Sequence, residues 1–212
     1  MIYASSEIFS DTSVFQKKYN LLFLPEKQIR VALTKNPYIK EIHLIRQFPS
    51  TLVIRVVQRR PLLKVDIQNQ TMFIDEEGNS MYPLSQFSNL QLPLLTCSIE
   101  QLEFDNTTIT NRKLLRVLTI IYKTIQKGVT IDTVVCEGTD TFFFTSGKTQ
   151  VLFSSVQNSD GLASSLQYLF KQFRIESSYP ERLDMRFEKP VLVPKIEALT
   201  PASDAAQKET SF

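Results

Sequence analysis

The chain has 212 residues, of which 42% are hydrophobic and 22% are charged, a composition typical of a folded protein. Its 5 glycines argue against a glycine-rich cofactor loop, no run of about 18 apolar residues predicts a transmembrane helix, and no signal peptide opens the sequence. The net charge of +2 is uneven, because residues 1–66 hold 11 basic and 5 acidic residues whereas the remainder holds 13 and 17. The basic part suits anionic lipid headgroups or nucleic acid, or serves only as a solvated surface.

The first part of the chain predicts a strand and two helical segments. Residues 2–9 have the pattern of a strand, residues 10–18 that of a short helical turn, and residues 25–35 that of a helix. Pro25 suits the first helical turn, because the N–H there has no intrahelical partner. Asn36-Pro37 ends this helix.

Two strand-like runs, 38–48 and 51–57, then flank Pro49-Ser50. Proline cannot extend a ladder, so the pair predicts an antiparallel hairpin. A period of two gives the second run an apolar face that we expect to pack against the helix, with Arg55 on the opposite face. That apolar face consists of Leu52, Ile54 and Val56. The matching face of the first run consists of Ile42, Leu44 and Phe48, with His43 on the other side.

This segment resembles the end of a POTRA domain, and more narrowly the POTRA domain of the division proteins FtsQ and DivIB. The matching motifs are Asn36-Pro37-Tyr38-Ile39, Phe48-Pro49-Ser50-Thr51-Leu52, and Ile54-Arg55-Val56 running into Arg59-Arg60-Pro61. The resemblance implies the order strand, helix, helix, strand, strand (β-α-α-β-β) over residues 1–64. It also implies a single membrane-spanning helix just before the first strand, which is absent from this chain.

Beyond Pro61 the pattern changes to short strands and two amphipathic helices. Strands are predicted over 64–68, 71–75, 80–84, 92–96, 131–136, 141–145, 150–154 and 182–187, the last extended by 189–194. Helices are predicted over 110–127, with Thr110 as N-cap, and over 160–173. Gly78 suits positive φ in a turn, and residues 195–212 lack any pattern and predict a disordered tail.

Three motifs of this second part also resemble FtsQ and DivIB. They are Phe73-Ile74-Asp75 with Gly78, Leu92-Pro93-Leu94-Leu95-Thr96, and Leu183-Asp184-Met185-Arg186-Phe187. We therefore expect an α+β protein with a POTRA domain at 1–64, a mixed β-sheet domain with helices at 65–194, and the disordered C-terminal tail.

No constellation of residues predicts catalysis, a cofactor or a metal site. Ser146-Gly147-Lys148 ends like a phosphate-binding loop, but Phe142 replaces the required glycine and a strand-like run follows. Asp75-Glu76-Glu77 lacks the spacing of a calcium loop and predicts an exposed turn. His43 is the only histidine and has no nucleophile near it in sequence. We expect Cys97 and Cys136 to be small buried hydrophobic residues at strand ends, or to form a disulfide if the compartment is oxidising.

The resemblance implies a non-catalytic scaffold of the bacterial divisome. Such proteins are single-pass proteins of the plasma membrane, with this region extracytoplasmic. They bind FtsB/DivIC-like and FtsL-like proteins to help control septal peptidoglycan synthesis, and other divisome proteins through the POTRA domain. The alternative is a POTRA-containing receptor or chaperone module of an outer-membrane assembly or secretion system, which predicts tandem POTRA repeats or a β-barrel.

Two surfaces are expected to bind partners. The last strand, 182–193, should lie at a sheet edge and add a partner strand, with Leu183, Met185 and Phe187 facing the core. The residues expected to read the partner are Arg182, Asp184, Arg186, Glu188, Val191 and Val193. A second docking surface is expected at Arg55, Arg59, Arg60 and Lys64. It has neither exposed aromatics nor a recognition helix beside it, so nucleic acid is not an expected partner.

Overall fold

A computed structural model describes residues 23–193, apart from residues 68, 88, 99–101, 106 and 139. The strand expected at 2–9, the helical turn expected at 10–18 and the tail expected at 195–212 lie outside the described residues. The helices are α1 (Glu26–Thr34), α2 (Arg112–Gln126) and α3 (Ser159–Glu176), with a short 3-10 helix, η4, at Ser85–Phe87. The strands are β1 (Ile39–Gln47), β2 (Thr51–Gln58), β3 (Leu63–Ile67), β4 (Gln70–Ile74), β5 (Ser80–Met81), β6 (Leu94–Thr96), β7 (Phe104–Asp105), β8 (Thr108–Ile109), β9 (Thr133–Glu137), β10 (Thr141–Ser146), β11 (Thr149–Ser154), β12 (Arg182–Asp184) and β13 (Val191–Val193).

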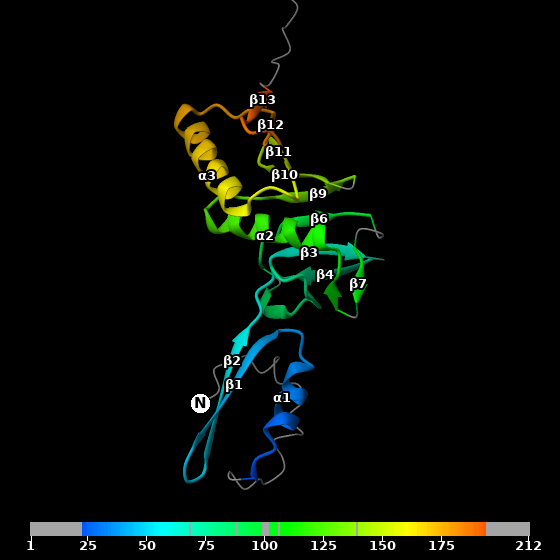
Figure 1. Cartoon of the computed structure of the whole chain (residues 1–212), viewed down its shortest axis with the longest axis vertical. Coiled ribbons are helices and arrows are strands. Elements are labelled where there is room, and N and C mark those ends of the chain that lie inside the picture. The colour runs from blue at the N-terminus through cyan, green and yellow to red at the C-terminus, as the bar shows by residue number, and fades with distance from the viewer. Residues whose placement is uncertain are drawn as a thin grey trace, which may run out of the picture.

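Helix α1 and the antiparallel pair β1–β2 form one end of the molecule, which we call the hairpin unit (Figure 1). The predicted hairpin is confirmed, with Leu44 opposite Ile54 and His43 opposite Arg55. Its core consists of Leu24, Ile29, Leu33, Ile39 and Ile42, with Leu44, Leu52, Ile54 and Val56 at the margin. Arg55 is exposed, so the predicted facing of β2 is confirmed. The prediction for Phe48 is wrong, because the ladder ends at Gln47 and the Phe48 side chain is 66% exposed in the turn.

The remaining long elements form a second unit, the sheet unit, around one mixed nine-stranded sheet. The strand order is β13-β12-β11-β10-β9-β6-β3-β4-β5, with parallel pairing at β3–β6, β6–β9 and β11–β12. Helices α2 and α3 lie together on one face of this sheet (Figure 1). Alternation along β10 buries Phe142 and Phe144 beneath them, where they join Val117 and Leu166 from the helices in one core. The fold is therefore mixed α+β, as predicted.

The turn between β4 and β5 is built around Asp75. Its Oδ1 accepts hydrogen bonds from the backbone N–H groups of Glu77 at 3.0 Å and Asn79 at 2.7 Å. Gly78 has a φ of 85°, as predicted, and a β-carbon there would collide with Leu115 of α2. The prediction of an exposed turn is wrong at Asp75, which is 1% exposed, whereas Glu77 is exposed.

The α2 helix begins differently from the prediction. Asn111, not Thr110, caps it, with Oδ1 accepting from the backbone N–H groups of Lys113 and Leu114. The Thr110 hydroxyl instead donates to the carbonyl of Glu103, because the chain is still in the loop that follows β8. The division of the chain at residue 64 stays a prediction, and the first strand of the large sheet, β3, begins at Leu63.

Candidate interaction edge

Strand β13 forms one border of the nine-stranded sheet. It pairs antiparallel with β12, with Leu192 opposite Leu183 and Val191 opposite Asp184. Among the described residues, no strand pairs with its outer side. Val191, Leu192 and Val193 are 47%, 50% and 42% exposed, so three consecutive apolar residues border the sheet without cover from the described part of the chain. An apolar strand at an open edge is the usual template for strand addition.

The edge is not where the sequence placed it. We predicted one strand from Arg182 onward, extended by residues 189–194, but β12 ends at Asp184 and the chain reverses before β13. The Met185 N–H still donates to the carbonyl of Leu152 in β11. The Met185 carbonyl accepts from the Gln157 side chain, and the chain leaves the ladder at this point. Strand β13 therefore pairs with the side of β12 that was expected to be open, and residues 191–193 form the edge of the sheet.

The residues expected to read a partner therefore divide into groups. Val191 and Val193 lie on the free edge, and Glu188 is exposed in the reversing loop. Arg182 is exposed, and its Nε donates to Gln150 Oε1 of the neighbouring strand β11 at 2.9 Å. Asp184 and Arg186 bind each other, and Asp184 is only 9% exposed, so its expected outward role is wrong.

The predicted inward facing is partly right. Leu183 and Met185 are buried, at 0% and 5% exposure. Phe187 is 59% exposed, and the prediction that it faces the core is wrong, because it lies in the reversing loop and outside any ladder. Its ring instead lies beneath the Arg186 guanidinium, 5.8 Å from the ring centroid.

A groove of about 270 Å³ runs beside this edge, between α3 and the reversing loop. Leu162 and Ser165 of α3 line one wall, and Met185, Phe187 and Pro190 line the other. Sequence reasoning missed this groove because its walls come from segments that are about 20 residues apart and carry no shared motif.

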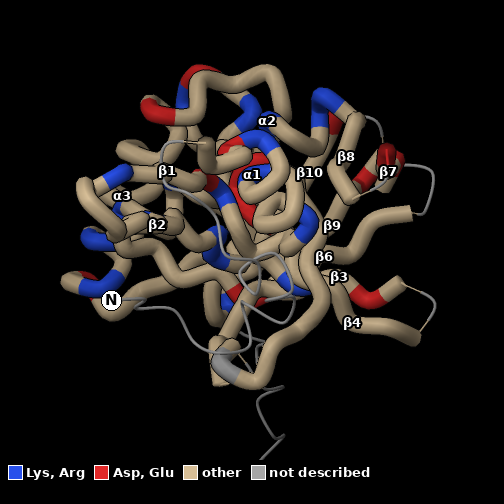
Figure 2. Tube along the Cα trace, turned by 90° about the horizontal axis from the view of Figure 1, so that it is seen from below, with Lys and Arg blue, Asp and Glu red and all other residues tan. Residues whose placement is uncertain are grey.

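The second expected docking surface is not one surface. Arg55 is exposed in the middle of β2, Lys64 is half-buried in the large sheet, and Arg60 is exposed between the two units. Arg59 is engaged, with its Nη1 2.6 Å from Asp75 Oδ2. Viewed from the hairpin end, basic and acidic positions are interspersed along the chain rather than gathered into one patch (Figure 2).

The other residues that the sequence analysis weighed for catalysis or ligand binding, Gly147 and His43, contact neighbouring carboxylates. Gly147 lies in the β10–β11 turn, and its N–H is taken by Asp132 Oδ2 at 2.7 Å, where a phosphate loop would present it to phosphate. His43 is exposed beside Glu41, whose carboxylate is 3.4 Å from Nε2. Within the described part of the chain, no group of His, Cys, Asp and Glu side chains has the arrangement of a metal site.

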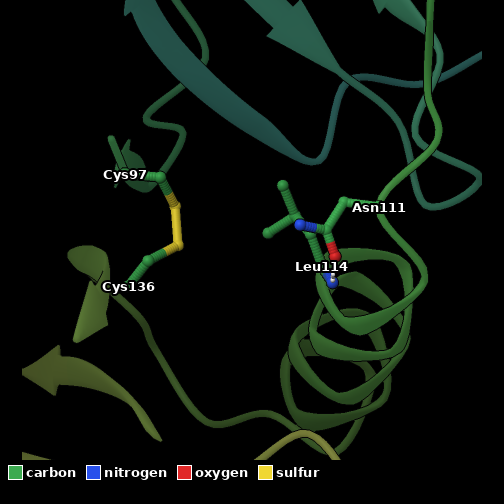
Figure 3. Close-up of a disulfide and its surroundings, with 4 residues drawn as sticks. All are labelled: Cys97, Asn111, Leu114 and Cys136. Carbon is green, nitrogen blue, oxygen red and sulfur yellow. Dashed lines mark hydrogen bonds between the residues drawn. A yellow bond between two sulfur atoms is a disulfide. The ribbon is translucent and has the colours of Figure 1, made fainter. Parts of the chain in front are cut away.

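Cys97 and Cys136 are joined by a disulfide (Figure 3). Cys97 follows β6 and Cys136 lies in β9, one residue beyond the paired positions Thr96 and Val135. The pairing places their Cα atoms 4.9 Å apart, within the range that a disulfide needs. The interpretation as two separate buried thiols is wrong, because the parallel contact of β6 with β9 brings together residues 39 positions apart.

Comparison with known proteins identifies the hairpin unit. Residues 3–59 match the family model described as POTRA domain, FtsQ-type. The chain is 38% identical over 63 residues to the cell division protein FtsQ of Rickettsia bellii, which is 30% of this chain and 24% of that protein. It is 29% identical over 93 residues to FtsQ of Anaeromyxobacter sp., and 23% identical over 103 residues to the cell division protein DivIB of Clostridium botulinum. These overlaps span 44% and 49% of this chain, and 31% and 39% of those relatives.

The N-terminal part of the molecule is therefore a POTRA domain of the FtsQ type. In the part of the chain that is matched, its sequence is similar to the FtsQ/DivIB family of cell-division proteins. Its matches span between about a quarter and two fifths of the lengths of these relatives. Within residues 23–193, as far as the structure describes them, no helix has the length and apolar character to cross a membrane.

Proposed function

We propose that this chain is the extracytoplasmic part of a non-catalytic divisome scaffold. The scaffold binds FtsB/DivIC-like and FtsL-like proteins and thereby helps to control septal peptidoglycan synthesis. The scaffold is held in the plasma membrane by a single helix, and its POTRA domain docks other divisome proteins. The family assignment supports the division context, and the names of the relatives favour it over the outer-membrane assembly alternative.

The free edge of β13 is the observation that carries the proposal. An edge strand presents N–H and C=O groups that another strand can pair with, so backbone hydrogen bonds supply affinity. Alternating side chains then supply selectivity, and Val191 and Val193 share one face while Leu192 lies on the other. The neighbouring groove at Phe187 and Pro190 offers a place for a side chain or helix of the partner next to the added strand.

The disulfide supports an extracytoplasmic location. Disulfides form and persist in oxidising compartments outside the cytoplasm, and reducing agents of the cytoplasm keep thiols apart. Both cysteines of the chain are used in the Cys97–Cys136 bond. The bond ties the residue that follows β6 to the neighbouring strand β9 and leaves no free thiol among the described residues.

The test is a calorimetric titration of the chain with overlapping peptides from the extracytoplasmic region of the FtsB/DivIC-like protein of the same organism. Leu192→Pro removes one N–H from the edge strand and should lower affinity at least about tenfold, since proline cannot extend a ladder. Leu192→Ala removes the side chain but keeps the N–H, and should weaken binding less.

Two results decide the proposal. Equal affinity of Leu192→Pro and the unaltered chain, with both folded by circular dichroism, would show that the partner does not use β13. Absence of binding by every peptide to the unaltered chain would reject the assigned partner class. Removal of residues 195–212 should leave affinity unchanged, because these residues follow β13 and do not form it.

A further inference from the structure

Two cations of the hairpin unit reach the acidic turn of the sheet unit. Lys40 Nζ lies 2.8 Å from Glu76 Oε1 and 2.9 Å from Glu77 Oε1. Arg59 Nη1 lies 2.6 Å from Asp75 Oδ2 and 2.7 Å from Glu77 Oε2. Each of these contacts crosses the junction between the two units, so together they join the POTRA domain to the large sheet.

The hairpin ladder explains why the two cations lie together. Lys40 is the second residue of β1 and Arg59 directly follows β2, while Ile39 pairs with Gln58. The Arg59 N–H also donates to the carbonyl of Tyr38 at 2.8 Å. The antiparallel pairing thus brings residues 38–40 and 58–59 to the end of the hairpin that faces the large sheet (Figure 1).

Hydrogen bonds within its own turn hold the carboxylate of Asp75 in place, independently of the two cations. Asp75 is buried and uses Oδ1 for the backbone of its own turn, which leaves Oδ2 directed at Arg59. Asn79 Nδ2 also donates to Oδ2, at 3.1 Å. A carboxylate fixed by several hydrogen bonds costs little further entropy when it pairs with a cation.

An aromatic contact lies beside the charges. Tyr38 is 2% exposed and stacks on Phe87, with ring centroids 5.4 Å apart, and its hydroxyl donates to the carbonyl of Tyr82. Burial raises the pKa of Tyr38 to about 12, so the hydroxyl remains a donor at neutral pH. The ring packs in a cluster with Phe73 and Met81 of the sheet unit. The apolar burial is not directional and only holds the units in contact, so their rotation is left to the directional contacts, which are the Tyr38 hydroxyl bond and the ion pairs.

We propose that Lys40 and Arg59 form an electrostatic clasp on Asp75, Glu76 and Glu77, and that this clasp fixes the rotation of the POTRA domain about the Tyr38 contact. The clasp therefore sets the direction of the hairpin relative to the β13 edge at the far end of the molecule (Figure 1). Its cations and carboxylates are partly exposed, apart from Asp75, so salt should loosen it. The clasp is a property of the chain alone and does not depend on the identity of any partner.

Pulsed electron–electron resonance between two spin labels tests the clasp in the full chain. Arg55→Cys on β2 and Lys171→Cys on α3 place labels at exposed positions of the two units, and the native cysteines are already bonded. We expect a narrow distance distribution in this background. Lys40→Gln with Arg59→Gln should broaden it at least about twofold, and so should about 1 M NaCl, where the screening length falls to about 3 Å.

Arg60→Gln is the matched control, because it removes the same charge from the neighbouring exposed position and should keep the narrow distribution. Tyr38→Ala should both broaden and shift the distribution, since it removes the contact about which the units turn. A narrow distribution in Lys40→Gln/Arg59→Gln would overturn the clasp. If that variant does not fold, the salt series decides, and a narrow distribution at about 1 M NaCl overturns the proposal.

Discussion

Arg186 closes over the carboxylate of Asp184, two residues before it in the chain. Its Nε lies 2.9 Å from Oδ1, its Nη2 lies 2.5 Å from Oδ2, and its backbone N–H donates to Oδ1 at 3.0 Å. The Arg186 side chain holds the pKa of Asp184 below its ordinary range, with burial working against it. The pair ends β12 and turns the chain toward β13, so it shapes the candidate edge without facing a partner.

Arg186→Glu should lower the melting temperature. The substitution places a second carboxylate against a nearly buried one, so Asp184 loses its donors and meets repulsion. Thermal unfolding followed by circular dichroism checks this. Glu188→Gln, in the exposed part of the same loop, is the control and should leave the melting temperature unchanged. Equal melting temperatures for Arg186→Glu and the unaltered chain would show that the pair does not organise the loop.

The two faces of β2 should respond differently to the same charge. Ile54→Asp places a carboxylate against the apolar margin of the hairpin core and should destabilise the POTRA domain by roughly 1–3 kcal/mol. Arg55→Asp changes the exposed neighbour and should alter stability by less than about 0.5 kcal/mol. Urea unfolding measures both. Similar losses for the two variants would contradict the observed facing.

The cap of α2 can be separated from the residue before it. Asn111→Ala removes the acceptor for two N–H groups and should cost about 1 kcal/mol of unfolding free energy. Thr110→Ala removes only an exposed hydroxyl bond to a loop carbonyl, and should cost less. Chemical denaturation of both variants measures the difference, and a larger loss for Thr110→Ala would restore Thr110 as the cap.

The disulfide should contribute substantially to stability. Cys97 and Cys136 are 39 positions apart, and a crosslink over such a loop restricts the unfolded chain. Cys97→Ala with Cys136→Ala should therefore lower the unfolding free energy by roughly 2–4 kcal/mol. Guanidinium unfolding with and without a reducing agent measures this. Reductant should destabilise the unaltered chain to the level of the double variant and leave the double variant unchanged. An unaltered chain that does not respond to reductant would contradict a bond between these residues.

Acid should remove the contribution of Glu77 to the junction. Lys40, and then Arg59, hold the pKa of Glu77 below its ordinary value of 4.5. A carboxylate with a lowered folded pKa stabilises the folded state above its unfolded pKa, and this stabilisation is lost as the pH falls through the folded pKa. The unaltered chain should melt above Glu77→Gln at pH 7, and the difference should vanish as the pH falls below 4.5. A difference in melting temperature that persists below pH 4.5 would mean that packing, and not the charge of Glu77, causes it. The control Glu188→Gln should melt at the same temperature as the unaltered chain throughout this pH range.

Several elements with a local cause were predictable from the sequence, although the exact cap of α2 was not. The period of two in β2 placed Ile54 and Arg55 on opposite faces, and the apolar stripe of α2 predicted a helix that ends near Gly128. Gly78 was predictable because a positive φ is a property of a single residue and its turn. Each of these features depends on neighbours within one or two helical turns, or on alternate residues of one strand.

Tertiary structure alone decided the features that join distant segments. The parallel pairing of β6 with β9 brought Cys97 to Cys136, and the antiparallel pairing of β13 with β12 moved the sheet edge from β12 to β13. The junction of Arg59 with Asp75 buried a carboxylate that the sequence placed in an exposed turn. Such contacts depend on which strands pair in the folded sheet. The spacing of two residues in the sequence does not determine the distance between them in space.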